Sequence, residues 1–252
     1  VPGDVIAGVS ITDEASRRRA ARALFQTCRR PHDGLGDRYV IRAVSLRITS
    51  LLCRISATPN QVTWANIGVG LAAAVVVVRG TWTAFAVAGA LMFLQVVLDS
   101  CDGELARIRH LHSRFGMWLD NVSDDLIDNV FLAALAIGVG GIWMPIGVAA
   151  AAARSACAVM IHLDVARRGK PGDVLAFKWF FDTAGEELAE RFDTSQSVAG
   201  VVRAFGRRDL YVLVYAASCL AGVPAVALVL GTTLSVAYAA LGVVHVVVSP
   251  RR

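Results

Sequence analysis

Four aspartates in the middle of the chain have the spacing of side chains that act together. Asp99 and Asp102 are three residues apart, and Asp120 and Asp124 are four apart. Each pair shares one face if both stretches are helical. The flanking segments are apolar, so the acids are expected where two membrane helices meet, near one end of each. An ionised aspartate at such a depth costs at least ~2.5–3.5 kcal/mol and normally faces a partner, a cavity or an ion.

Divalent cations are the partners that these acids favour. Four neighbouring carboxylates repel one another unless cations neutralise them, and no Cys or His pattern accompanies them. Oxygen ligands alone suit Mg²⁺ or Mn²⁺. Two such ions about 3.5–4 Å apart could clamp the attacking and leaving oxygens of a phosphoryl transfer. The sequence therefore predicts a two-metal phosphotransfer site.

Two glycines and an arginine between the acids are compatible with a phosphate ligand. Gly103 and Gly116 leave faces free of side chains, and Arg107 lies one turn beyond Gly103 and can donate to phosphate. Each residue alone also has a structural explanation, since membrane-helix glycines usually serve packing and terminal arginines usually reach headgroups. Together with the acids, the combination favours a nucleotide or phosphate site.

The complete pattern resembles the signature of the CDP-alcohol phosphotransferase family. It reads Asp99-x2-Asp102-Gly103-x2-Ala106-Arg107-x8-Gly116-x3-Asp120-x3-Asp124. The resemblance implies that an acceptor hydroxyl attacks the β-phosphate of a CDP-alcohol and that CMP is released. It implies metal ligation by Asp99, Asp102 and Asp120, and a general base at Asp124 that also contacts the second metal. By the same resemblance, Gly103, Ala106, Arg107 and Gly116 line the CDP pocket, and the protein is a homodimer with six spans.

A second resemblance concerns the segment before the first span. The residues are Arg30-Pro31, Asp33-Gly34, Arg38-Tyr39, Arg42, Ser45 and Arg47, followed by Thr58-Pro59-Asn60-Gln61-Val62-Thr63. They look like the start of the membrane half of bifunctional inositol-phosphate cytidylyltransferase/di-inositol-phosphate-phosphate synthases. The resemblance adds Thr63 to the donor pocket and favours CDP-inositol with inositol phosphate. It makes residues 1–35 a cytosolic segment, compatible with the end of an upstream nucleotidyltransferase, and 36–252 the membrane domain.

The composition predicts an all-α integral membrane protein. Of the 252 residues 56% are hydrophobic, and the five cysteines lack any paired spacing. A short soluble helix is expected at 13–25, and an amphipathic basic helix at 39–55 is too charged to span and suited to the interface. Hydrophobic runs predict six transmembrane helices, with a kink at Pro224 inside the fifth. These spans are 59–78, 81–107, 115–138, 143–162, 210–230 and 232–248.

The distribution of basic residues predicts the orientation. The net charge is +5, and the basic residues concentrate before the first span, between 107 and 114, between 167 and 208, and at the C-terminus. The positive-inside rule then puts both termini and the acids on the cytoplasmic side of an inner membrane of bacterial or archaeal type. Attraction to lipid headgroups or phosphorylated substrates explains the charge better than nucleic-acid binding.

The acceptor site is predicted from arginines near the same membrane face. Arg154 is the one arginine within the fourth span, and Arg207-Arg208 precede the fifth. A buried arginine is expensive unless it faces a cavity or an anion, so a phosphorylated acceptor is expected there. Alternatively, Arg154 pairs with an acid such as Asp128, and Arg207-Arg208 anchor to headgroups.

Two other functions are compatible with the acids. A phospholipid synthase would join CDP-diacylglycerol to a polar alcohol or its phosphate. An ion- or proton-coupled transporter would instead need polar residues through the whole membrane depth. The segments 85–94 and 130–142 are almost wholly apolar, which disfavours the transporter.

Overall fold

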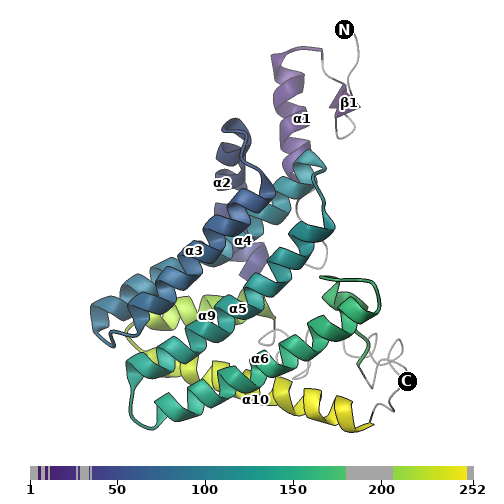
Figure 1. Ribbon diagram of the computed structural model, residues 1–252. Coiled ribbons are helices and arrows are strands. Elements are labelled where there is room, and N and C mark those ends of the chain that lie inside the picture. The colour runs from purple at the N-terminus through teal and green to yellow at the C-terminus, as the bar shows by residue number, and fades with distance from the viewer. Residues whose placement is uncertain are drawn as a thin grey trace, which may run out of the picture.

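The described part of the chain is almost entirely helical. The computed structural model describes residues 5–6, 9–10, 12–26, 28, 34, 36–179 and 207–248. Within these residues one antiparallel pair of two-residue strands, β1 (Val5–Ile6) and β2 (Val9–Ser10), is the only sheet. The helices, labelled in Figure 1, are α1 (Glu14–Gln26), α2 (Arg42–Arg54), α3 (Pro59–Val77), α4 (Trp82–Arg109), α5 (Arg114–Val139), α6 (Trp143–Arg167), α9 (Arg208–Leu220) and α10 (Pro224–Val248).

Four of these helices, α3, α4, α6 and α10, are long and apolar enough to cross a membrane. They confirm the prediction of an integral membrane protein. The helix α5 is also long, but it carries four aspartates, and α9 spans only 13 residues, fewer than the ~20 that a bilayer crossing requires. The count of six spans therefore stays a prediction.

The predicted boundary between the last two helices is wrong. A kinked span over 210–230 was expected, but α9 ends at Leu220 and α10 begins at Pro224. Proline is favourable at the first helical position because its missing N–H has no helical partner there. Gly222 in the turn has a φ of +74°, and a Cβ on it would lie 2.6 Å from the indole Nε1 of Trp82. The turn thus depends on glycine twice, through its backbone conformation and through the close approach.

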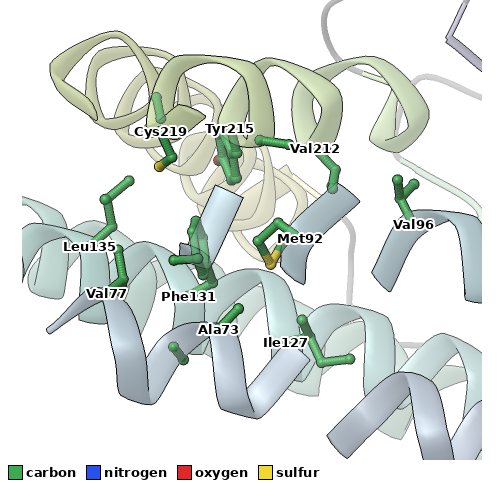
Figure 2. Close-up of a cluster of buried hydrophobic side chains, with 14 of the residues drawn as sticks. Ala73, Val77, Met92, Val96, Ile127, Phe131, Leu135, Val212, Tyr215 and Cys219 are labelled. Carbon is green, nitrogen blue, oxygen red and sulfur yellow. The ribbon is translucent and has the colours of Figure 1, made fainter. Parts of the chain in front are cut away.

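The helices around the acids share one apolar core. Figure 1 shows α3, α4 and α5 side by side, with α9 packed against α4. In Figure 2 the core side chains of these four helices point toward one another: Ala73, Val77, Met92, Val96, Ile127, Phe131, Leu135, Val212, Tyr215 and Cys219. Small residues bring the backbones close, since a Cβ on Gly70 would lie 2.6 Å from the side chain of Ile127. This packing fixes the helices that carry the acids.

The helix α2 docks onto α4 through a buried polar face. Glu104 of α4 is fully buried and accepts hydrogen bonds from Arg42 (Nη1, 2.6 Å), Ser45 (Oγ, 2.6 Å) and Thr49 (Oγ1, 2.6 Å). The basic helix expected at 39–55 was predicted to lie in the interface, yet its Arg42 is only 5% exposed. The polar side chains of α2 therefore pack against the protein as well as making the helix amphipathic. The interfacial location of this helix stays a prediction.

We expect Glu104→Gln to destabilise the protein by about 3–5 kcal/mol, because the buried guanidinium of Arg42 would lose its carboxylate. The midpoint of thermal unfolding in detergent micelles would measure the change. Glu14→Gln is the matched control, because Glu14 pairs with Arg18 on the exposed surface of α1, where such pairs contribute about 0–1 kcal/mol. Equal, small effects of both substitutions would contradict the role of the buried pair.

Candidate active site

Three of the four predicted aspartates meet between two consecutive helices. One carboxylate oxygen each from Asp99 of α4 and from Asp120 and Asp124 of α5 lie within 4.8 Å of one another. The turn between these helices is short. It begins at His110, whose φ of +53° ends α4, and Ser113 caps α5 by accepting a hydrogen bond from the Gly116 N–H at 2.9 Å. The turn therefore places the acids of both helices opposite each other.

The first turns of α3 orient the two acids of α4. Thr63 donates its hydroxyl to Asp102 Oδ2 at 2.7 Å, and Asn66 Nδ2 donates to Asp99 Oδ1 at 3.4 Å. Asp102 is 5% exposed and lies outside the group of three oxygens. Asn66 was missed in the sequence. Its position three residues after Thr63, and so on the same helix face, was the signal that could have found it.

Unpaired carboxylate oxygens show that the cluster fits a cation. Asp120 Oδ1 and Asp124 Oδ1 are buried and have no hydrogen-bond partner within the described part of the chain. A buried anionic oxygen without a partner is unfavourable, and a divalent ion bound at the cluster would compensate this buried negative charge. Because the three residues offer only oxygen, the donor set suits Mg²⁺ or Mn²⁺ better than Zn²⁺.

One arginine already contacts the acidic cluster. Arg208, at the start of α9, places its Nη1 2.8 Å from Asp99 Oδ2 and 2.9 Å from Asp124 Oδ2. Its neighbour Arg207 instead pairs with Asp209 at 3.2 Å. The two arginines were predicted together, and the structure brings the guanidinium of Arg208 into contact with Asp99 and Asp124.

Arg154 reaches the same region from α6. Its Nη2 donates to the hydroxyl of Tyr211 at 2.7 Å and lies 3.6 Å from Asp128 Oδ2. The structure thus contains the ion pair with Asp128 that the sequence left open as an alternative. Arg208 binds the same carboxylate, through its Nε at 3.2 Å. Arginines of two helices therefore meet at Asp128, one turn beyond Asp124.

The small residues of the motif permit close contacts. A Cβ on Gly103 would lie 3.3 Å from Arg107 Nη1, so the guanidinium of Arg107 lies close to this bare stretch of α4. A Cβ on Gly116 would lie 2.9 Å from Ser113 Oγ and 3.0 Å from Asn60 Oδ1. Gly116 thus lets the first turn of α5 approach the first turn of α3. Ala106 is half-buried on the same helix as Gly103.

Apolar helices around converging carboxylates define an integral membrane protein with a candidate divalent-metal centre. A family model described as CDP-alcohol phosphatidyltransferase matches residues 56–248. The chain therefore belongs to this family, and the predicted enzyme class, a CDP-alcohol phosphotransferase, is confirmed.

Curated relatives cover the same region of the chain. Proteins named bifunctional IPC transferase and DIPP synthase match from Thermococcus kodakarensis (36% identical over 120 residues, 47% of this chain and 27% of the relative) and Aquifex aeolicus (37% over 111 residues, 44% and 25%). The protein of the same name from Archaeoglobus fulgidus is 33% identical over 121 residues, 48% of this chain and 24% of the relative. The matched region spans about a quarter of each relative.

Proposed function

We propose that this chain transfers a phosphoalcohol from a CDP-alcohol to the hydroxyl of a second alcohol and releases CMP. The convergence of Asp99, Asp120 and Asp124 carries the proposal, because carboxylates from two helices are what a metal-assisted phosphoryl transfer needs. In the reaction, the acceptor oxygen forms a bond to the β-phosphorus. The bond from that phosphorus to the bridging oxygen breaks, and the electron pair leaves with CMP.

Asp124 is assigned as the general base. Its Oδ2 pairs with Arg208, whereas its Oδ1 has no hydrogen-bond partner among residues of the described ranges and can take the hydroxyl proton. Asp99, Asp102 and Asp120 are assigned as ligands of one or two Mg²⁺ or Mn²⁺ ions, with Asp124 contacting the second. When bound, the metal neutralises charge on the phosphate oxygens.

The donor pocket is assigned to residues near the start of α3 and at the junction of α4 and α5. Arg107 donates to the diphosphate beside the bare face of Gly103, and Gly116 keeps the opposite helix close. Thr63 holds Asp102 in place. Ala106 is also assigned to the lining of the donor pocket, as the resemblance implies.

The acceptor is proposed to be phosphorylated, with inositol phosphate as the first candidate and CDP-inositol as its donor. Arg208 contacts the base Asp124, and Arg154 lies beside Asp128 one helical turn further on, and guanidinium groups match phosphate oxygens well. The names of the three relatives support this choice. Arg207 contributes less, because its guanidinium pairs with Asp209.

Release of CMP from a panel of donors and acceptors tests the reaction. CDP-inositol with inositol phosphate should turn over fastest, and CDP-diacylglycerol with the same acceptor is the comparison for a phospholipid synthase. If only the lipid donor reacts, the family reaction holds but the polar donor is wrong. No CMP release from any pair, with folded and metal-loaded protein, contradicts the whole proposal.

A prediction concerns the acceptor alone. Arg154→Gln should raise the KM for the phosphorylated acceptor by at least tenfold and change the KM for the donor less than twofold, because ground-state binding of the phosphate is lost. Arg168→Gln is the control, since Arg168 follows the last residue of the same helix and pairs with Asp164 at the surface. Equal damage to both KM values, or an unphosphorylated alcohol that reacts better, would contradict the assignment.

The arrangement in the membrane is also part of the proposal. The acids lie where α4 ends and α5 begins, beside basic residues of the connecting turn, so the positive-inside rule supports a cytoplasmic active site. Six spans are proposed from the hydrophobic runs and an interfacial location for α2 from its amphipathic, basic pattern. A homodimer and an upstream nucleotidyltransferase before residues 36–252 are proposed from the resemblances described above.

A further inference from the structure

A fifth aspartate, which the family motif does not include, lies beneath the active site. Asp128 follows Asp124 by one helical turn of α5, and its side chain is 1% exposed. It accepts hydrogen bonds from Arg208 Nε (3.2 Å), Arg208 Nη2 (3.4 Å) and the hydroxyl of Tyr211. Arg154 Nη2 lies 3.6 Å away. One buried carboxylate thus joins α5 to α6 and α9.

Asp128 contacts more than one cation. Two guanidinium groups face this single carboxylate, and that of Arg208 also contacts Asp99 and Asp124. A buried acid that served only to cross-link the helices would need one arginine, and additional buried charge is costly. Arg208 serves more than this cross-link, because its Nη1 lies within hydrogen-bond distance of Asp99 and Asp124.

The contacts of Arg208 divide between two kinds of acid. Its Nε and Nη2 form a fork on the two oxygens of Asp128, and this fork fixes the plane of the guanidinium. Its Nη1 occupies oxygens of Asp99 and Asp124, two of the three residues that can ligate a metal. A divalent ion needs to displace only the Nη1 contacts, while the fork on Asp128 persists.

We propose that Asp128 is a positioning residue that keeps the guanidinium groups of Arg208 and Arg154 beside the metal ligands. In this role it limits the competition of Arg208 with the metal for Asp99 and Asp124, and it holds both cations where an acceptor phosphate binds. The first effect depends only on the acids and Arg208. The second rests on the proposed function.

The test is the Mn²⁺ affinity of the purified full chain in lipid nanodiscs, measured from the electron paramagnetic resonance signal of free Mn²⁺. Asp128→Asn should weaken Mn²⁺ binding about tenfold, because Arg208 would lose its charged partner at position 128 and, within the described part of the chain, keep Asp99 and Asp124 as its carboxylate partners. Asp125→Asn is the matched control. It removes the same charge next to Asp124, but Asp125 pairs with His162 at 3.0 Å and not with Arg208. It should change the affinity less than twofold.

A double-mutant cycle isolates the role of Arg208. In an Arg208→Gln background, Asp128→Asn should alter Mn²⁺ affinity less than twofold, because the competing cation is absent. A loss of affinity that persists in this background, or an equal loss in Asp125→Asn, overturns the proposal. If Asp128→Asn does not fold, Asp128→Asn/Arg154→Gln removes one negative and one positive charge, keeps the wild-type net charge of the region, and should show the same tenfold weakening.

Kinetics at saturating Mn²⁺ test the second effect. Asp128→Asn should raise the KM for the phosphorylated acceptor at least tenfold and leave the KM for the CDP-alcohol within twofold. A merely structural role of Asp128 would damage both constants alike. If no phosphorylated acceptor is a substrate, the proposed function fails in this respect, whereas the Mn²⁺ measurements still decide whether Asp128 positions Arg208.

Discussion

Asp124→Asn is expected to lower the rate of CMP release by roughly 10²–10⁴-fold, the range that a general base contributes. Asparagine has nearly the same shape and can still accept the contact that Arg208 Nη1 makes with Asp124 Oδ2. It cannot take a proton from the acceptor hydroxyl. Binding of the CDP-alcohol, measured by equilibrium dialysis, should therefore change little while turnover is lost.

The neighbouring acid provides the control for this variant. Asp125→Asn removes one negative charge from the next position of the same helix, where the carboxylate contacts His162. Its rate of CMP release should stay within about twofold of the wild type. If Asp124→Asn also releases CMP at a near-normal rate, the base is another residue, and the unpaired Oδ1 of Asp124 serves the metal alone.

The meeting of the acids was predictable because it depends on local periodicity. Spacings of three and four residues put Asp99 beside Asp102 and Asp120 beside Asp124 on any helix. The short basic segment between the two hydrophobic runs required a tight turn, and the structure has one between α4 and α5. Family motif and periodicity agreed, and the structure brings Asp99, Asp120 and Asp124 together, whereas Asp102 lies outside this group and the roles as ligands stay a prediction.

The contacts that surround the acids could not be predicted in the same way. Arg208 and Asp99 are 109 residues apart, and Arg208 and Asp128 are 80 apart, so only the packing of α9 against α4 brings them together. The sequence offered Arg207 and Arg208 as equivalent, whereas one helical position decides which of them faces the cluster. The role of Glu104 was not predictable either, because it occupies a variable position of the motif. Its importance follows from the packing of α2 over it.

The predicted boundary between the last two helices, α9 and α10, was wrong for a local reason. Apolar residues continue on both sides of Pro224, so hydropathy alone joined the end of α9 to the beginning of α10. The turn depends instead on Gly222 and on proline at the first position of a helix. A prediction that gave these two residues more weight than the hydrophobic run would have placed the boundary between α9 and α10 correctly.

Removal of divalent metal is expected to abolish turnover completely. Thorough treatment with EDTA should stop CMP release, and Mg²⁺ or Mn²⁺ should restore it, because Asp120 Oδ1 and Asp124 Oδ1 lack other partners in the part of the chain that is described. Zn²⁺ should restore it poorly, since the cluster of Asp99, Asp120 and Asp124 offers no nitrogen or sulfur ligand.

Substitutions of single ligands connect this result to the cluster. Asp99→Ala and Asp120→Ala should each remove metal-dependent CMP release and weaken Mn²⁺ binding, which electron paramagnetic resonance measures without any substrate. Asp164→Ala should affect neither, because Asp164 pairs with Arg168 near the end of α6. Full activity of the chelated protein would contradict the role of the carboxylates as ligands of a catalytic metal. Loss of activity in the two variants with unchanged Mn²⁺ affinity would place the metal elsewhere and leave Asp99 and Asp120 as partners of Arg208 or of the substrate.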